Sequence, residues 1–466
     1  MNDDARARLI AALEDRYRRR TPKGFRIHER ARKVMVRGGS HTLRLWSPYP
    51  VSLSRAKGAL IWDADANAYT DYWQGHYANI LGHNPAVVLR ALRGIHEEGA
   101  LQTGFEEAVQ IELAEIIQRQ LGWEGNRVRF TTSGTLATMY AVMLAEAYTG
   151  RELVLKVGGG WHGASPYLLK GVHFDPVRGF DHADSAGVPS ALSRKTLVTR
   201  FGDLDSLKAV LKAKGDRIAC FIVEPFLGAG GFLPAPKDYL REARRLTERY
   251  GVLLIFDEII SGFRFAPTGL QTLYGIRPDL STLGKLIGGG HAVSAVVGRA
   301  DIMGGCEARA PRGRRVVFEG GTFSAHAEYV AAGLALVKHL IRHADEVYPR
   351  LARLGERLRR GIASAFAASG IEARCTGGGN DVVPGSSLFF IHFPRSGAPF
   401  RTVDDLHDPR VSDADLRERI LKLALLNEGV HVMHGGGAVS TAHDDAAVLR
   451  TIDACAEVGR LFKTYA

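Results

Sequence analysis

The fold of this chain is decided by a stretch that reads Val252-Leu253-Leu254-Ile255-Phe256-Asp257-Glu258 and, further along, Ser281-Thr282-Leu283-Gly284-Lys285-Leu286-Ile287-Gly288-Gly289-Gly290. A short apolar run that ends on two acids is typical of a buried parallel strand. Open α/β sheets place their ligands at the carboxyl ends of such strands. We therefore expect Asp257 to face a ligand. Glycines directly behind Lys285 would let a flat ligand approach the backbone there.

An acid and a lysine are the pair that pyridoxal phosphate chemistry requires. Lys285 would form the Schiff base, and Asp257 would keep the pyridine nitrogen protonated so that the ring can accept electrons. Taken alone, this segment leaves another interpretation open. Asp257 and Glu258 could cap the next helix, and Lys285 could be a solvated surface residue. The rest of the chain favours the cofactor.

From about residue 105 the pattern alternates between helices and short apolar strands. Such alternation predicts an α/β fold, with a mostly parallel sheet flanked by helices on both faces. The predicted strands are 127–131, 153–157, 196–199, 218–223 and 252–256, and the predicted helices between them are 106–121, 136–147, 204–213 and 239–250.

We predict three regions along the chain. Residues 1–72 form an N-terminal segment that packs with the small domain, 73–335 the large cofactor-binding domain, and 336–466 a C-terminal small α+β domain. The flanking regions are expected to contain an amphipathic helix over 4–20, strands over 51–53 and 59–63, a long helix over 325–342, a helix over 349–367 with Pro349 in its first turn, a strand over 387–393, a polar stretch over 395–413, a helix over 413–427 and a βα unit over 430–462.

Composition excludes several classes of function. The chain has 466 residues, a formal net charge of +11 and 45% hydrophobic residues, which is ordinary for a globular protein. Basic clusters at 16–20 and 312–315 lack any nucleic-acid-binding motif, so we expect no nucleic-acid partner. The four cysteines are widely spaced, which indicates neither a disulfide framework nor a metal site. No apolar run approaches 18 residues and the start is unlike a signal peptide, so we expect a cytoplasmic protein without a membrane span.

Two further segments combine hydroxyls and glycine at the start of a predicted helix. They are Thr131-Thr132-Ser133-Gly134-Thr135 and Gly320-Gly321-Thr322-Phe323-Ser324. Free N–H groups and the helix dipole make such a place an anion site, although a plain helix cap uses the same residues. Trp161 follows a predicted strand and has glycines on both sides, so it could stack on a heteroaromatic ring or be an ordinary core residue.

These motifs together resemble the class III aminotransferases, which are fold-type I pyridoxal phosphate enzymes, close to the glutamate semialdehyde aminomutase branch. The resemblance covers about residues 35–445, and the block from Asp257 to Lys285 is its most specific part. The segments that carry it are Phe130-Thr131-Thr132-Ser133-Gly134-Thr135, Trp161-His162-Gly163, Ile222-Val223-Glu224-Pro225, Leu254 to Arg264, Pro278 to Lys285 and Gly321-Thr322-Phe323-Ser324.

The resemblance implies roles for individual residues. Lys285 would hold the cofactor as an imine and then move the proton during the reaction. Asp257 would pair with the pyridine nitrogen. The cofactor ring would lie between Ile259 on one face and Trp161 on the other. The remaining implied cofactor contacts are Ser133, Gly134 and Thr135 at the phosphate, together with His162 and Glu224.

Two more roles follow from the resemblance. Thr322 would reach the phosphate in the neighbouring subunit, which implies a homodimer. Arg44 falls where relatives close to the aminomutase hold a substrate carboxylate, a task suited to a bidentate guanidinium. Its alternative is a surface arginine.

The chain also departs from the family pattern, at Leu136, His326, Ala229 and Gly435. Gly435 replaces an acid thought to hold the diamino intermediate of the aminomutase. We therefore expect transamination between a carboxylate-bearing amine or amino acid and a keto acid or aldehyde, with intramolecular amino exchange of the aminomutase type as the alternative. A third possibility is a catalytically silent relative with a binding or scaffold function, and the intact Asp257 and Lys285 pair argues against it.

Overall fold

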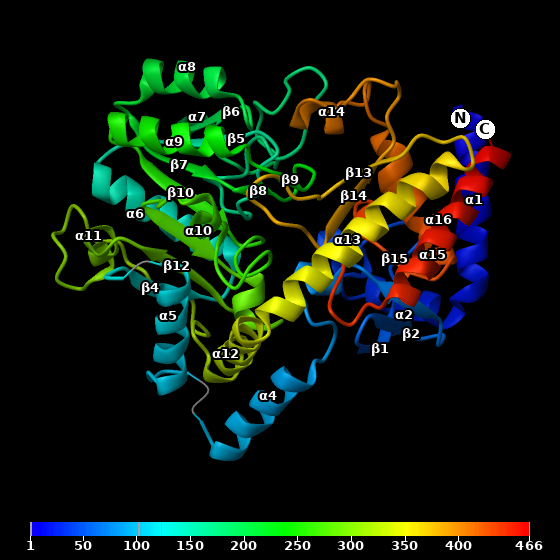
Figure 1. The fold of residues 1–466 in the computed structure, drawn as a ribbon, viewed down its shortest axis with the longest axis horizontal. Coiled ribbons are helices and arrows are strands. Elements are labelled where there is room, and N and C mark those ends of the chain that lie inside the picture. The colour runs from blue at the N-terminus through cyan, green and yellow to red at the C-terminus, as the bar shows by residue number, and fades with distance from the viewer. Residues whose placement is uncertain (1, 101–102, 123, 466) are drawn as a thin grey trace.

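The computed structural model describes residues 2–100, 103–122 and 124–465 and is built around a seven-stranded sheet (Figure 1). Its order is β4-β12-β11-β10-β7-β5-β6. The strands are β4 (Arg127–Thr131), β5 (Leu153–Val157), β6 (Thr196–Thr199), β7 (Ile218–Val223), β10 (Leu253–Glu258), β11 (Leu280–Leu283) and β12 (Ser294–Gly298). β10 pairs in parallel with β7 and β11, and β5 pairs in parallel with β6 and β7.

β12 runs antiparallel to both of its neighbours, β11 and β4. The sequence analysis predicted neither β12 nor β11. Both are short strands on either side of the glycine-rich turn that carries Lys285, with no long helix between them. The other strands confirm the prediction of a mostly parallel sheet.

Helices cover both faces of this sheet, so β10 is buried along its whole length. Alternate side chains of β10 enter different cores. Leu253 and Ile255 pack in the cluster that contains α6, whereas Leu254 and Phe256 pack with α8 and α9. The helices around this sheet are α4 (Ala86–Glu98), α5 (Ala108–Gln120), α6 (Gly134–Thr149), α7 (Ser190–Lys195), α8 (Leu204–Lys214), α9 (Lys237–Tyr250), α10 (Leu270–Tyr274), α11 (Ala300–Met303) and α12 (Ala327–Arg342).

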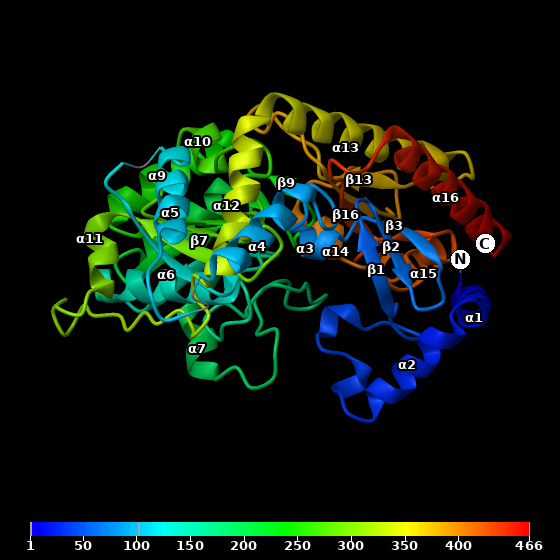
Figure 2. The ribbon, with the colours of Figure 1, turned by 90° about the horizontal axis from the view of Figure 1, so that it is seen from below.

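The two ends of the chain meet in a second body (Figures 1 and 2). There β3 pairs in parallel with β15, so the N-terminal segment and the C-terminal region share one sheet. The domain boundaries at 72 and 335 stay a prediction. The strands here are β1 (Leu53–Lys57), β2 (Leu60–Asp63), β3 (Ala68–Asp71), β13 (Arg374–Thr376), β14 (Leu388–His392), β15 (Val430–His431) and β16 (Gly436–Ala438), and a separate short pair is β8 (Phe226–Leu227) with β9 (Leu233–Pro234).

The helices of this second body are mostly long. They are α1 (Asp3–Arg20), α2 (Pro22–Arg32), α3 (Gln74–Tyr77), α13 (Ala344–Ala367), α14 (Val403–His407), α15 (Lys422–Asn427) and α16 (Asp445–Thr464). The prediction that Pro349 lies in the first turn of its helix is wrong, because α13 begins at Ala344 and contains the proline. Proline has no N–H to donate, so the interruption of the hydrogen-bond ladder is confined to one position near the start of a long helix.

Other differences are local. The first strand, β1, is Leu53–Lys57, so it shares only Leu53 with the strand expected over 51–53. The stretch 395–413, which was expected to be only polar, contains α14. The predicted helix over 413–427 is a π-helical turn (Leu416–Leu421) followed by α15. Short 3-10 turns lie at Val36–Gly38, Thr42–Arg44, Lys285–Gly288 and Gly304–Cys306. No helix in the described part of the chain is long and apolar enough to cross a membrane.

The packing of α12 on the Lys285–Gly288 turn leads to a stability prediction. A Cβ added to Gly333 would lie 1.9 Å from the carbonyl oxygen of Ile287. We expect Gly333→Ala to destabilise the protein by about 1–3 kcal/mol, because backbone must move to make room, and to lower the thermal unfolding midpoint.

Gly94→Ala is the matched control, since Gly94 is also inside a helix but a Cβ there would have nothing within 4 Å. This change should stabilise by up to about 1 kcal/mol. Equal midpoints for the two variants would contradict the packing described here.

Candidate functional site

A cavity of about 190 Å³ lies where five strands of the large sheet end. Its walls come from the segments that follow β4, β5, β7 and β11, and from the end of β10, as expected for an open α/β sheet. The lining residues are Gly134, Thr135, Thr138, Trp161, His162, Gly163, Glu224, Asp257, Ile259, Ile260, Lys285 and Ser294. A second cavity of about 180 Å³ lies between α1 and α15, away from the strand ends.

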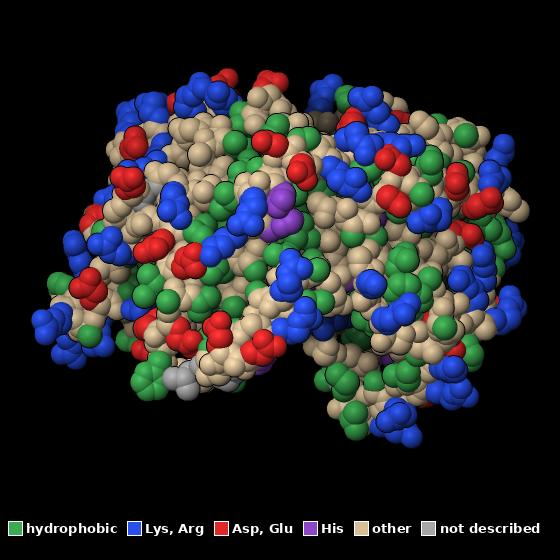
Figure 3. Space-filling model, turned by 60° about the horizontal axis from the view of Figure 1, so that its bottom comes forward, with side chains coloured by type: hydrophobic (Ala, Val, Ile, Leu, Met, Phe, Trp, Pro, Cys, Tyr) green, Lys and Arg blue, Asp and Glu red, His purple; other side chains and the backbone are tan. Residues whose placement is uncertain are grey.

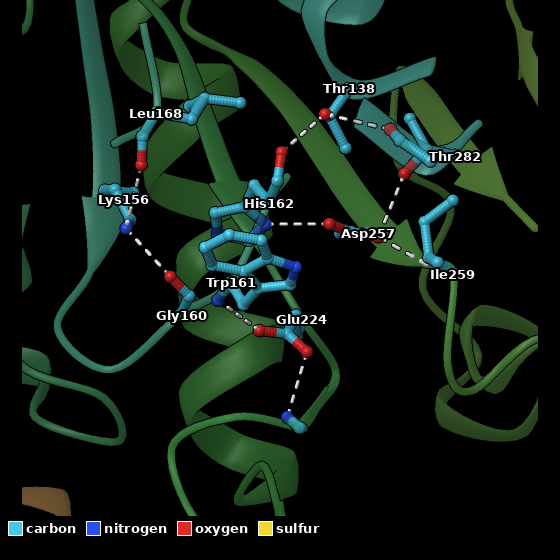
Figure 4. A network of polar contacts seen from close by, with 12 residues as sticks. Thr138, Lys156, Gly160, Trp161, His162, Leu168, Glu224, Asp257, Ile259 and Thr282 are labelled. Carbon is cyan, nitrogen blue, oxygen red and sulfur yellow. Dashed lines mark hydrogen bonds and ion pairs between the residues drawn. The ribbon is translucent and has the colours of Figure 1, made fainter. Parts of the chain in front are cut away.

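Asp257 is buried and tightly held. One carboxylate oxygen accepts hydrogen bonds from Thr282 Oγ1 and from the backbone N–H of Ile259, each at 3.1 Å. The other lies 2.8 Å from Nδ1 of His162 (Figure 4). Burial lowers the pKa of His162, so its imidazole is neutral and donates the Nδ1 proton to Asp257. These donors hold the negative charge of Asp257 at the cavity wall.

Lys285 begins the turn that follows β11 and has a left-handed backbone, with φ 45°. The turn is confined by its neighbours, since a Cβ on Gly289 would lie 2.5 Å from the carbonyl oxygen of Ala332. Burial lowers the pKa of Lys285 to about 8, although the carboxylate of Asp257 opposes this. With a lowered pKa, more of this amine is neutral near physiological pH than of an ordinary lysine, and the neutral form is the nucleophile.

The side chain of Lys156 fixes the loop that carries Trp161 by hydrogen bonds. This lysine lies inside β5 and is completely buried. Its Nζ donates to the carbonyl oxygens of Gly160 at 2.8 Å and Lys170 at 2.6 Å. Burial lowers the pKa of Lys156 to about 8. The sequence analysis missed this residue, and the available signal was a lysine in the middle of an apolar strand.

Glu224 holds the same loop from the other side. Its carboxylate accepts the backbone N–H of Trp161 and that of Gly228, each at 2.9 Å. Burial and the nearby charge of Asp257 raise the pKa of Glu224 above its ordinary value. Figure 4 shows the indole of Trp161 beside these groups, with Ile259 on the far side of Asp257 in that view.

The start of α6 forms another wall. Ser133 caps this helix, because its hydroxyl accepts the N–H of Leu136 at 3.3 Å. Gly134 and Thr135 line the cavity, where the first N–H groups of a helix favour an anion. A Cβ on Gly134 would lie 3.2 Å from the side chain of Ile259, so a larger residue would narrow the cavity.

The structure thus brings most of the predicted site residues to one cavity: Lys285, Asp257, Gly134, Thr135, Trp161, His162, Glu224 and Ile259. Three predicted site residues, Ser133, Arg44 and Thr322, do not line it. Arg44 is exposed and donates to Ser40 Oγ at 3.1 Å. Thr322 is also exposed, and its carbonyl oxygen accepts the hydroxyl of Thr103 at 2.7 Å. Lining residues that the sequence analysis did not name as site residues are Thr138, Gly163, Ile260 and Ser294.

Known proteins are similar to this chain both in sequence and in overall fold. Residues 44–373 match the family model described as aminotransferase class-III. The chain is 37% identical over 432 residues to a glutamate-1-semialdehyde 2,1-aminomutase of Thermoplasma acidophilum, with 92% of this chain and 96% of that protein covered.

Two solved structures are similar over nearly the whole chain. One is a beta-phenylalanine aminotransferase from Variovorax paradoxus, with 29% identity, a TM-score of 0.83 and 97% of each chain covered. The other is a transaminase with PLP bound, with 28% identity, a TM-score of 0.81, and 95% of this chain and 98% of that chain covered. These findings confirm the resemblance and the fold class that the motifs predicted.

The environment of Lys285 leads to a prediction about its reactivity. Only the neutral amine attacks an acylating reagent, and the neutral fraction rises with pH through the pKa. With a pKa of about 8, Lys285 of the cofactor-free protein should reach half of its maximal acylation rate near that pH, as measured by peptide mass after a short pulse with an N-hydroxysuccinimide ester. Ordinary surface lysines in the same digest serve as the control, with a midpoint near about 10.4. A midpoint for Lys285 that coincides with theirs would contradict the proposed effect of burial.

Proposed function

Because this chain belongs to the class III aminotransferase family, we propose that it moves an amino group from a carboxylate-bearing amine or amino acid to a keto acid or aldehyde, with pyridoxal phosphate in the Lys285 cavity. The observation that carries this proposal is the cavity itself, in which the nucleophilic amine of Lys285 and the buried carboxylate of Asp257 share one wall of strand ends.

The residues present fit this cofactor. Asp257 offers a fixed negative charge to a protonated ring nitrogen, while the start of α6, with Gly134 and Thr135, offers N–H and hydroxyl groups to a phosphate. Trp161 and Ile259 supply apolar surfaces for a flat ring. When bound, pyridoxal phosphate accepts electron density from the substrate carbon that carries the amino group.

The remaining steps belong to side chains of this chain. The Nζ of Lys285 would hold the cofactor and, when free as a neutral amine, would accept the proton from the substrate carbon that carries the amino group and give it back at another position. His162 keeps Asp257 charged and oriented through its Nδ1–H. Glu224 positions Trp161 through the backbone N–H of that residue.

The aminomutase alternative is favoured by the 37% identity to a glutamate-1-semialdehyde 2,1-aminomutase. One position disfavours it. Gly435 has a left-handed backbone, with φ 73°, and a Cβ there would lie 2.3 Å from Cγ of Arg417. An acidic side chain at this position would therefore need Arg417 to move and would adopt a backbone conformation that favours glycine. A purely binding or scaffold function would leave the Lys285 and Asp257 pair without a purpose.

A half-reaction screen tests the proposed function. The cofactor-loaded protein is mixed with a panel of amines while the visible absorbance of the bound cofactor is followed. We expect a carboxylate-bearing amine to bleach the band without a second substrate, and a keto acid to restore it.

Lys285→Ala should slow the bleaching by about 10²- to 10⁴-fold, because the proton carrier is lost. Conversion of glutamate semialdehyde with no acceptor present would favour the aminomutase instead. If no amine in the panel and no semialdehyde changes the absorbance, the enzymatic proposal fails.

The active unit is proposed to be a homodimer in the cytoplasm, with Thr322 at the phosphate in the neighbouring subunit. Support comes from the exposed side chains of Phe323 (57% exposed) and Phe105 (72% exposed), which flank the contact between Thr103 and Thr322. All four cysteines are free, as suits a reducing compartment.

Light scattering should therefore give about twice the chain mass of 50.8 kDa. A double change, Phe105→Ser with Phe323→Ser, should shift the protein towards monomer and weaken cofactor binding, because an exposed apolar patch of this kind stabilises an interface. A wild-type protein that stays monomeric at micromolar concentration would contradict the dimer.

A further inference from the structure

A left-handed turn follows β3 and leads towards the site. The backbone φ angles are 49° at Gln74, 62° at Gly75, 59° at His76 and 68° at Tyr77. Each residue other than glycine costs about 1–2 kcal/mol in this conformation. Strain of this kind persists only where surrounding groups impose it, and it concentrates at functional sites.

The first half of the turn is imposed by Asp71. Its carboxylate accepts the backbone N–H of Trp73 at 3.0 Å and of Gln74 at 2.9 Å. The same carboxylate binds His83 Nε2 at 2.7 Å and His431 Nδ1 at 2.6 Å. Although burial opposes it, these two histidines hold the pKa of Asp71 well below its usual range, so the carboxylate is charged.

The second half is tied to the cavity by Arg264. This buried guanidinium donates to the carbonyl oxygen of Tyr77 and, at 2.8 Å, to that of Ile260. Ile260 lines the cavity. The turn is thus held at one end by a charged network and at the other by the segment that follows Asp257.

The residue that this turn presents is His76. Its ring is half-buried, with centroid distances of 4.5 Å to Trp73 and 5.5 Å to His41. Among the described residues, the imidazole has no hydrogen-bond partner. Burial is the main cause that lowers the pKa of His76 to about 4, and positively charged groups add to it. Those groups are Arg44, His41, Lys285 and His434.

These surroundings favour an anion. A neutral imidazole offers an N–H donor, and the nearby guanidinium of Arg44 provides the positive charge that a carboxylate seeks. His434 is already engaged, since its Nδ1 lies 2.8 Å from Glu418. His41 also uses its Nδ1, which accepts the backbone N–H of Leu43 at 3.2 Å, whereas His76 has both ring nitrogens free among the described residues. Figure 3 shows the surface hollowed between the two bodies of the molecule.

We propose that His76 determines specificity by donating a hydrogen bond to the substrate carboxylate, on the same side of the site as Arg44. The inference rests on the proposed aminotransferase function, and it adds a residue from the strained turn to the carboxylate subsite. If the ring of His76 only packed against Trp73, replacing it would affect amines with and without a carboxylate equally.

His76→Phe keeps a ring for Trp73 and removes the donor, whereas His76→Asn keeps a donor and suits a left-handed backbone. Half-reaction rates are measured with 3-aminobutanoate and with butan-2-amine, which has a methyl group in place of the carboxylate. For 3-aminobutanoate, His76→Phe should lower kcat/KM by about 10- to 100-fold, as loss of a hydrogen bond to a charged group does. The rate with butan-2-amine should change by less than about threefold, and His76→Asn should recover part of the loss.

His96→Phe is the control, because His96 is a surface histidine that pairs with Glu328 at 3.4 Å. It should leave both substrates unaffected. An equal loss for both amines in His76→Phe, or no loss for 3-aminobutanoate, would overturn the proposal.

A binding measurement separates this inference from the proposed function. Butanoate and butan-1-ol are titrated into the cofactor-loaded protein by calorimetry, which needs no turnover. Butanoate should bind His76→Phe about tenfold or more weakly than wild type, with butan-1-ol unchanged. If no amine reacts but His76→Phe still binds butanoate more weakly than wild type, the anion subsite is supported and the aminotransferase proposal is contradicted. If amines react but butanoate binds both proteins equally, only the role of His76 falls.

Discussion

The site depends on one buried hydrogen bond, between Asp257 and His162 at the end of β10. A carboxylate this deep in the sheet is stable as an anion only when donors surround it. His162, Thr282 and the N–H of Ile259 supply those donors. These donors come from segments at one edge of the sheet, because β10 pairs in parallel with β11 and β7, and β7 pairs in parallel with β5.

Close approach of backbone explains the rest of the cavity. Gly134 lies against the side chain of Ile259, and a Cβ on Gly163 would come within 2.6 Å of Cα of Thr135. The loop that carries Trp161 is fixed by hydrogen bonds to two buried polar side chains, Lys156 and Glu224, rather than by apolar packing. A polar scaffold of this kind defines one loop position, because each donor and acceptor must find its own partner.

The opposite side of the site is assembled from distant parts of the chain. Asp71 ends β3, His431 lies in β15, and their hydrogen bond accompanies the pairing of these two strands. Through Asp71 the junction between the N-terminal segment and the C-terminal region also shapes the turn that presents His76. The substrate side therefore depends on the association of the two bodies, whereas the wall with Asp257 belongs to the large sheet alone.

The sequence by itself determined the residues at strand ends. An apolar run followed by Asp257, a turn with Lys285 and a helix start at Gly134 are local patterns, and parallel strands bring their carboxyl ends together whatever the intervening loops. Only the tertiary structure decided the antiparallel β12, the buried ammonium of Lys156 and the left-handed turn at His76, and it left Arg44 and Thr322 outside the cavity. The reason is physical. Each of these features depends on partners that are distant in the chain. The groups that stabilise a strained backbone or a buried charge therefore cannot be identified until the fold brings them together.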